Sequence, residues 1–415
     1  MTSVLFKKEK KVIEYALKAV ALYNPGTVSL TGDNIYYFER IVYILGGMIT
    51  VQGFKDYDEH LHSLISRAIA RFRSYKKKTL FCLKKALEAE LNESKKQQAK
   101  KFTVVFPINL KQSTLNNKRH FTLNRTKLNI HTLNYVLKKF DFKQTNVLPN
   151  VSIDKSKGIS SLSGFTFITI DVFAKNEIKA FEKTHRLFAI FRALSNFSLS
   201  YGHLTIQIGY PSALGSLNPP KNMFVFDSNR KYKGDWSNVG EFNYRLVSLT
   251  PDELKAVLKT INDYDILPDN SLKNVLTNCL TLHQYALDSI EPAYIFLNFW
   301  QILELVSLKD QLGNTENKVK TRITAIYKNN STISDILEVL FCKRNHLVHE
   351  GRLEDFSLSD VNEIKGIAEG AMSFLFSQVE KLENYPNLET FYENIKEKDK
   401  VKDKLRILNY IIKLP

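Results

Sequence analysis

The hydrophobic pattern of this chain changes twice, at Phe102 and at Thr250. Before Phe102, apolar residues recur at the three- and four-residue spacing of amphipathic helices. Between the two positions, short runs rich in Phe, Ile, Val and Thr alternate with turn residues, which favours strands. After Thr250 the helical spacing returns. Because 415 residues exceed one ordinary core, we expect a multidomain α+β protein.

The two changes divide the chain into four expected parts. These are a helical, lysine-rich N-terminal region at 1–101, a basic α+β domain at 102–250, an all-α helical bundle at 251–385, and a charged C-terminal tail at 386–415 that ends in a helix. In the first part we expect helices over 4–23, from Asp33, over 58–73 and over 75–101. In the second we expect five or six strands, among them Val104–Phe106 and Phe165–Phe173, and helices over 129–139 and 177–194.

The bundle is the part with the clearest helix boundaries. Thr250 predicts a capped helix start, because Pro251 occupies the first turn and Glu253 follows three residues later. Five further helices are expected at 271–289, 292–308, 318–327, 333–349 and 359–382. We expect Ser359 to cap the last of them.

Charge is distributed unevenly along the chain. The formal net charge is +16, but residues 1–250 hold 39 Lys and Arg against 18 Asp and Glu, whereas residues 251–382 hold 13 against 19. A positive excess attracts polyanions, because each phosphate that is neutralised releases condensed counterions. The alternative is a solvated, lysine-rich surface. Charge alone does not decide between the two.

Several classes of protein are disfavoured by composition. Three widely spaced cysteines provide neither a disulfide framework nor a paired metal knuckle. The lysine-rich start is not followed by the apolar segment of a signal peptide, and no window approaches the roughly 18 uncharged apolar residues of a membrane span. We therefore expect a cytoplasmic protein that has no membrane partner.

Basic and aromatic residues of the middle part suggest a nucleic-acid groove that works by charge and stacking. The residues are Arg119, His120, Phe121, Arg125, Tyr232, Lys233 and Trp236. The competing interpretation places the aromatic side chains in the core.

A polar cluster ends the otherwise apolar helix expected at 333–349. Asn345 and His349 are four residues apart and share a helix face, so the amide can hydrogen-bond the imidazole and select its tautomer. Arg344 and His349 are five apart, about 140° around the axis. One helix therefore does not aim both side chains at one atom, but a second copy packed antiparallel across a two-fold axis would bring two Arg and two His together.

Residues 344–349 (Arg-Asn-His-Leu-Val-His) resemble the R-N-x-x-x-H signature of HEPN-superfamily ribonucleases. The segment Phe299–Glu304 and the Glu-Gly pair after His349 resemble the ApeA-like branch of that superfamily. The resemblance covers about residues 270–382 and does not extend to the first 250 residues. It implies an HEPN-like helical bundle that acts as a homodimer, an endoribonuclease activity, and neither a metal nor another cofactor.

The resemblance also implies a role for each residue. His349 would be the general base or acid and Arg344 the clamp on the developing charge, with Asn345 orienting them. Glu304 and His346 are supporting candidates outside this catalytic set, and further nucleic-acid contacts are expected from Lys343, Arg352, Lys76, Lys77 and Lys78. Cleavage by the 2′-OH would give 2′,3′-cyclic phosphate and 5′-hydroxyl ends. The implied substrate is tRNA or mRNA, and the implied setting is a toxin or abortive-infection effector in antiphage defence, controlled by an antitoxin or a phage-derived trigger. The basic residues 1–250, with the domain at 102–250, would bind RNA or sense that trigger.

Two other interpretations compete with this one. Arg344 could simply tie two helices together through Glu304 or Glu350, and His349 could be a polar helix-end residue. The bundle would then be a non-catalytic interaction or dimerisation module on a nucleic-acid-binding regulatory protein. A further alternative places the chemistry in 102–250 and leaves the bundle to dimerise. Cys342 is expected to pack in the core.

Overall fold

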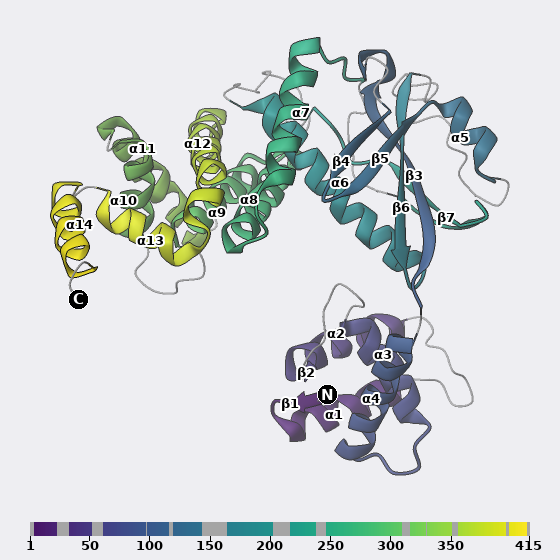
Figure 1. The fold of residues 1–415 in the computed structure, drawn as a ribbon. Coiled ribbons are helices and arrows are strands. Elements are labelled where there is room, and N and C mark those ends of the chain that lie inside the picture. The colour runs from purple at the N-terminus through teal and green to yellow at the C-terminus, as the bar shows by residue number, and fades with distance from the viewer. Residues whose placement is uncertain are drawn as a thin grey trace. The chain divides into compact units, whose positions relative to one another are not determined.

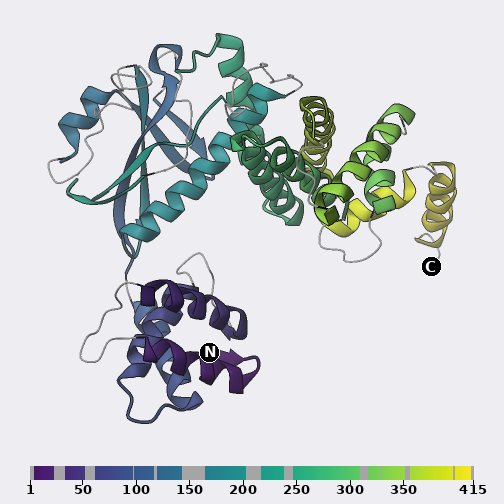
Figure 2. The same cartoon turned by 180° about the vertical axis from the view of Figure 1, so that it is seen from behind.

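The computed structural model describes most of the chain, and everything below concerns the described part. Its ranges are 4–22, 33–51, 61–96, 98–115, 119–142, 164–201, 216–237, 246–308, 316–328, 330–350, 356–395 and 398–412. The chain forms two compact units, one of Met1–Phe102 with Phe173–Ala180 and one of Thr103–Val172 with Phe181–Pro415. Helices and one larger sheet (Figures 1 and 2) confirm the mixed α+β class. None of the described helices combines the length and the apolarity needed to cross a bilayer.

The first unit is a set of helices with a two-stranded ribbon. Its elements are β1 Val4–Phe6, α1 Glu9–Ala21, α2 Asp33–Met48, β2 Ile49–Val51, α3 Leu61–Arg73 and α4 Leu80–Lys96. Residues 4–6, expected to be helical, instead pair antiparallel with β2, with Val4 opposite Val51. Val4 is buried and Leu5 is exposed, so the two-residue period of a strand applies here rather than the helical period.

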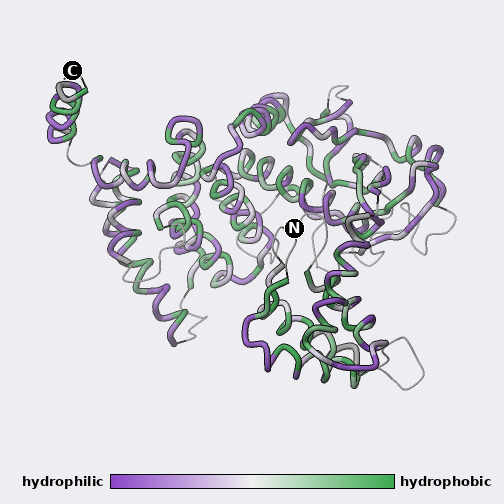
Figure 3. Tube along the Cα trace, turned by 60° about the horizontal axis from the view of Figure 1, so that its bottom comes forward, coloured by the Kyte–Doolittle hydropathy of each residue, from purple (hydrophilic) through white to green (hydrophobic). Residues whose placement is uncertain are grey.

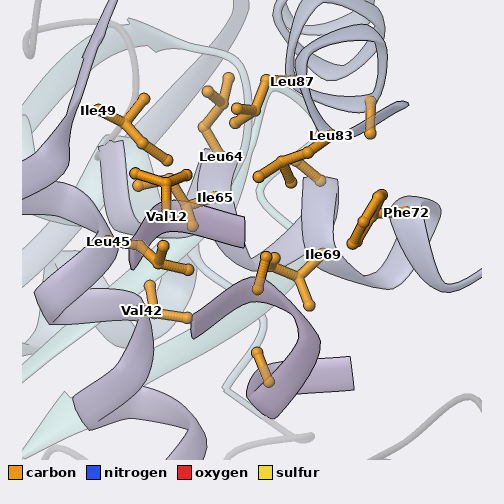
Figure 4. Packing of buried hydrophobic residues seen from close by; sticks show 14 of the residues in the cluster. Val12, Val42, Leu45, Ile49, Leu64, Ile65, Ile69, Phe72, Leu83 and Leu87 are labelled. Atoms are coloured by element: carbon orange, nitrogen blue, oxygen red, sulfur yellow. The ribbon is translucent and has the colours of Figure 1, made fainter. Parts of the chain in front are cut away.

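Apolar side chains from all four helices of the first unit meet in one core (Figure 4). Val12 of α1, Leu45 of α2, Ile65 of α3 and Leu83 of α4 are each at most 1% exposed. Arg71 on α3 donates to Glu90 on α4 at 2.7 Å beside this core. The amphipathic faces inferred from sequence therefore do pack against one another.

The second unit begins with a six-stranded sheet in the order β4-β5-β6-β3-β7-β8. The strands are β3 Lys100–Lys111, β4 His120–Leu123, β5 Thr126–His131, β6 Phe165–Ala174, β7 Asn222–Asp227 and β8 Tyr232–Ser237, and the associated helices are η1 Gln112–Leu115, α5 Leu133–Lys139 and α6 Glu177–Ser200. The pairs β4–β5, β5–β6 and β7–β8 are antiparallel. The strands expected at 104–106 and 165–173 are the centres of β3 and β6.

Both faces of the central strands are covered, which explains their nearly continuous apolar sequence. Phe106 of β3 contacts Phe188 of α6, with ring centroids 4.6 Å apart. The next residue back, Val105, belongs instead to a cluster with Val136 of α5. Helices α6 and α5 therefore contact side chains from opposite faces of the sheet.

The aromatic part of the nucleic-acid groove hypothesis is wrong for Phe121. Phe121 is 2% exposed and packs on Phe191, 4.8 Å away. Trp236 stacks on Phe181 at 4.4 Å with an interplanar angle of 12°. The buried Phe121 ring therefore offers no free face to a base, whereas Trp236 is half-buried with one face against Phe181.

Apart from the last of them, whose described side chains are all exposed, the remaining helices form the bundle. They are α7 Pro251–Ile266, α8 Ser271–Asp288, α9 Pro292–Leu308, α10 Glu316–Ile326, α11 Ser331–Asn345, the π-helical turn η3 His346–Glu350, α12 Leu358–Leu382, α13 Tyr385–Asn394 and α14 Lys398–Ile412. The capped start at Thr250 is confirmed, since its hydroxyl accepts from the Glu253 amide at 3.2 Å.

Three expectations about the bundle are wrong. Ser357, not Ser359, caps α12, because Asp360 three residues later completes a reciprocal capping box. Cys342 is exposed rather than in the core. The expected charged tail begins with a packed helix, α13, in which Tyr392 is buried and donates to the Val306 carbonyl at 3.2 Å.

A buried polar stripe on α6 connects the sheet to the bundle. Arg192, Asn196 and Ser200 recur every four residues and therefore share one helix face. Arg192 donates to Asp288 at 2.6 Å and Asn196 donates to Gln284 at 3.0 Å, both on α8. Hydrogen bonds along this stripe orient α8 relative to the sheet.

The last residue of the stripe meets a charged group inside the bundle. Glu369 accepts from Lys365 at 2.8 Å, from Ser200 at 3.2 Å and from His283 at 2.9 Å. The three titratable residues are at most 2% exposed. Burial lowers the pKa of His283, so the imidazole is neutral and donates to Glu369. Burial alone would raise the pKa of Glu369, but the bond from His283 and the Lys365 ammonium hold it below its ordinary value.

Glu369→Gln is expected to lower the free energy of unfolding by about 3–5 kcal/mol, because it leaves the Lys365 ammonium buried without a carboxylate. Lys365→Met combined with Glu369→Leu removes both charges and should recover most of that loss. Urea unfolding followed by far-UV circular dichroism measures both variants. A double variant as unstable as the single one would show that the charge pair is not the source of the effect.

Two glycines of α12 provide a matched pair of substitutions. Gly366→Ala meets open space and is expected to raise the free energy of unfolding by about 0.5–1 kcal/mol through helix propensity. Gly370→Ala is expected to lower it, because the added methyl overlaps the Tyr327 hydroxyl, which donates to the Ile367 carbonyl at 2.8 Å. Thermal unfolding of the two variants, with opposite signs expected, checks how tightly α10 packs on α12.

Candidate functional site

The polar cluster lies where α11 passes into the π-helical turn η3. Arg344 and Asn345 end α11, and His346 and His349 belong to the turn. Such turns are rare and occur often at functional sites. Because a π-helical turn holds more residues than an α-helical turn, it reduces the angle between Arg344 and His349 below the about 140° of a regular helix. In this turn the two side chains are therefore expected to diverge less than they would in a regular α-helix.

Two side chains contact the guanidinium of Arg344. Its Nη1 donates to Asn345 Oδ1 at 3.2 Å, and its Nη2 lies 3.4 Å from Glu304 Oε1 on α9. Trp300 donates to the same oxygen of Glu304 at 2.9 Å, which fixes the carboxylate. The side chains of Arg344 and Glu304 remain 25% and 33% exposed. The pair is thus long and open to solvent, a type that contributes little stability.

Both histidines of the turn are exposed. The expected bond between Asn345 and His349 does not occur among the described residues, because the Asn345 oxygen accepts from Arg344 instead. His349 is therefore open to an external molecule rather than held by its neighbour.

The residues expected to contact nucleic acid differ in whether they have a partner within the protein. Lys343 donates to Asp360 of the α12 capping box at 2.7 Å, so it has a structural partner. Burial alone would raise the pKa of Asp360, but the bonds from Lys343 and Ser357 hold it below its ordinary value. Arg352 lies outside the described residues.

In the first unit, Lys78 donates to the carbonyl of Arg73 at 2.7 Å and to that of Tyr75, and so closes the end of α3. Lys76 and Lys77 are exposed. Of the three neighbouring lysines, Lys78 thus has a structural role, whereas the side chains of the other two are exposed to solvent.

A pocket of about 510 Å³ opens beside the Arg344–Glu304 pair. It lies between α8 and α9, and its lining residues are Asn278, Thr281, Leu282, Gln301, Glu304 and Leu305. A lining that combines amide, hydroxyl and carboxylate groups with leucine side chains can bind a polar ring or a sugar. No sequence motif indicates this pocket. The signal available was the three-residue spacing of polar side chains on both helices.

Comparisons with protein-family models, with curated proteins and with solved structures found no match. Among the described residues, no group of three or more His, Cys, Asp or Glu side chains is placed to hold a metal ion. The candidate site therefore consists of Arg344, Asn345, His349, Glu304 and the adjacent pocket.

Arg344→Ala is expected to lower the free energy of unfolding by no more than about 1 kcal/mol, because its ion pair is long and partly exposed. Arg322→Ala is the matched comparison in the same bundle. Arg322 is 9% exposed and donates to the Ser307 carbonyl at 2.5 Å, so about 1.5–3 kcal/mol should be lost. Chemical unfolding of both variants measures the two losses in the free energy of unfolding. Equal losses would mean that Arg344 serves to join α9 and α11.

Proposed function

We propose that the chain is a metal-independent endoribonuclease that cleaves RNA through Arg344 and His349, as the resemblance to HEPN ribonucleases implies. The observation that carries the proposal is that Arg344 is oriented by weak, partly exposed contacts while His349 stays exposed in the adjoining π-helical turn. Strong burial of either group would have pointed to a structural role. The remaining steps follow from the chemistry of these groups.

Arg344 has the properties needed to stabilise a phosphorane. Its guanidinium is permanently charged and presents a fork of donors that matches phosphate oxygens. At 3.4 Å the Glu304 carboxylate orients this fork without a short bond, so exchange for a phosphate costs little. Asn345 supports the same guanidinium at 3.2 Å. Arg344 would then receive the negative charge that builds as the 2′-oxygen attacks.

His349 supplies the proton transfer. An imidazole titrates near neutrality and can take the proton from the 2′-OH or give one to the 5′-oxygen that leaves. One chain provides one such group, whereas the reaction needs both a base and an acid. A second copy across a two-fold axis would provide the other histidine, and the exposed Val348 and Cys342 offer neighbouring surface for that contact.

RNA binding is assigned to several parts of the chain. The positive excess lies in residues 1–250, whereas residues 251–382 are acidic. Attraction of RNA is therefore expected from the first part, including exposed Lys76 and Lys77. The pocket beside Glu304 would take a base or ribose next to the scissile phosphate. In the proposed setting the RNA is tRNA or mRNA, and an antitoxin or phage-derived trigger controls cleavage.

His349→Ala is expected to reduce RNA cleavage by about 10²–10⁴-fold through loss of proton transfer. Arg344→Ala should reduce it by about 10²–10³-fold through loss of charge stabilisation. His346→Ala, on the same exposed turn, is the matched control and should retain most of the activity. Cleavage of labelled RNA in EDTA, with analysis for 2′,3′-cyclic phosphate and 5′-hydroxyl ends, provides the measurement. Equal cleavage by the wild type and both site variants would exclude the proposal.

A second candidate is a non-catalytic interaction module. The Arg344–Glu304 contact and the acidic bundle favour it, because both suit a helix-joining role and a protein partner. This candidate predicts an inactive protein whose RNA binding is unchanged in His349→Ala. Filter binding beside the cleavage assay separates the two functions.

A further inference from the structure

The C-terminal helix α14 has only exposed side chains among those described in it. Its apolar residues Val401, Leu405, Leu408 and Ile412 are 38%, 56%, 54% and 79% exposed. Figure 3 shows both hydrophobic and hydrophilic turns in the tube next to the C-terminal label. Isolated helices of about 15 residues are marginal in water, so a stable α14 needs a partner over these side chains.

The four apolar residues form a narrow stripe. Their spacing of four, three and four residues is that of the a and d positions of a heptad repeat. At 100° per residue they lie within about 60° of one another. Helices that lie on membranes carry a broader apolar face, and among the described side chains of α14 the remaining exposed apolar residue, Ile407, lies about 130° from the midline of the stripe. The geometry therefore fits a second helix better than a lipid surface.

The charges of α14 are sorted around this stripe. Lys402 and Lys404 lie about 90° and 70° from its midline, on opposite sides, at the e and g positions. The acidic residues Asp399 and Asp403 lie about 150–170° away, on the opposite face. Lys402 does contact Asp399 at 3.3 Å, but both side chains are more than three-quarters exposed and such a pair is weak. The two lysines can therefore turn toward a partner.

A second copy of α14 would not satisfy these lysines. Neither described acidic residue of the helix flanks the stripe, and residues 398–412 carry five basic against two acidic side chains. Pairing two copies would bring like charges together and offer Lys402 and Lys404 no carboxylate. The favoured partner thus has apolar a and d residues and acidic flanks.

We propose that α14 is one strand of a heterotypic coiled coil whose other strand is an acidic amphipathic helix of another protein. The apolar stripe supplies the contact area, and Lys402 and Lys404 select Glu or Asp at the facing e and g positions. This interaction surface is separate from the Arg344 site and does not depend on the proposed cleavage.

Two labelled peptides of three heptads test the proposal with the full-length chain. Both have Ile and Leu at a and d, but one has Glu and the other Lys at every e and g position. In fluorescence anisotropy the wild type is expected to bind the acidic peptide at least about tenfold more tightly, and salt should weaken that binding. Lys402→Glu with Lys404→Glu should reverse the preference, a gain of binding that misfolding cannot produce.

A charge-matched variant provides the control for this peptide-binding test. Lys255→Glu with Arg406→Glu makes the same change of net charge away from the stripe and should keep the wild-type preference. Equal binding of both peptides, or of neither, would overturn the proposal. So would recruitment to phosphatidylglycerol vesicles without peptide binding. Self-association in analytical ultracentrifugation that Leu405→Asp abolishes would assign the stripe to a second copy instead.

Discussion

The buried polar stripe of α6 is the interaction on which the arrangement of the second unit depends. Hydrogen bonds from Asn196 and Ser200 are satisfied only when α8 and α12 stand at one register relative to α6. An apolar contact would tolerate sliding, whereas an unpaired Lys365 or Glu369 in a dry interior would cost several kcal/mol. Because Lys343 of α11 donates to Asp360 at the start of α12, the position of α12 also helps to set the position of α11.

The candidate site, unlike the α6 stripe, is held by weak contacts that remain partly exposed to solvent. The contacts of Arg344 are long and partly exposed, whereas Arg192 on the α6 stripe bonds Asp288 at 2.6 Å and is 5% exposed. Side chains that hold a fold together are desolvated and closely paired, and those that exchange partners must stay accessible. By this physical criterion Arg344 belongs to the second kind, as the proposed exchange of Glu304 for a phosphate requires. The site thus remains adaptable on a scaffold that is held rigidly elsewhere.

Much of the fold could be predicted from local pattern. The helices of the bundle were expected within a few residues of their bounds, because apolar periodicity and the Thr250 cap are local signals. Strand β1 and helix α13 could not be predicted, because pairing with β2 stabilises the first and packing of Tyr392 against the bundle stabilises the second. For the site, the residue types of the Arg344–His349 motif were evident, but the Arg344–Asn345 bond and the pocket between α8 and α9 were not.

The sequence by itself determined which residues carry chemistry, where the charge lies and that α14 is amphipathic, because residue type and spacing suffice for each of these. Only the tertiary structure decided which of those residues already have a partner within the fold. Lys78 and Lys343 looked like nucleic-acid contacts and proved to have partners within the fold, while His349 remained open. The physical reason is that a partner such as Asp360 or Glu304 is distant in sequence, so its contact exists only once the helices have packed.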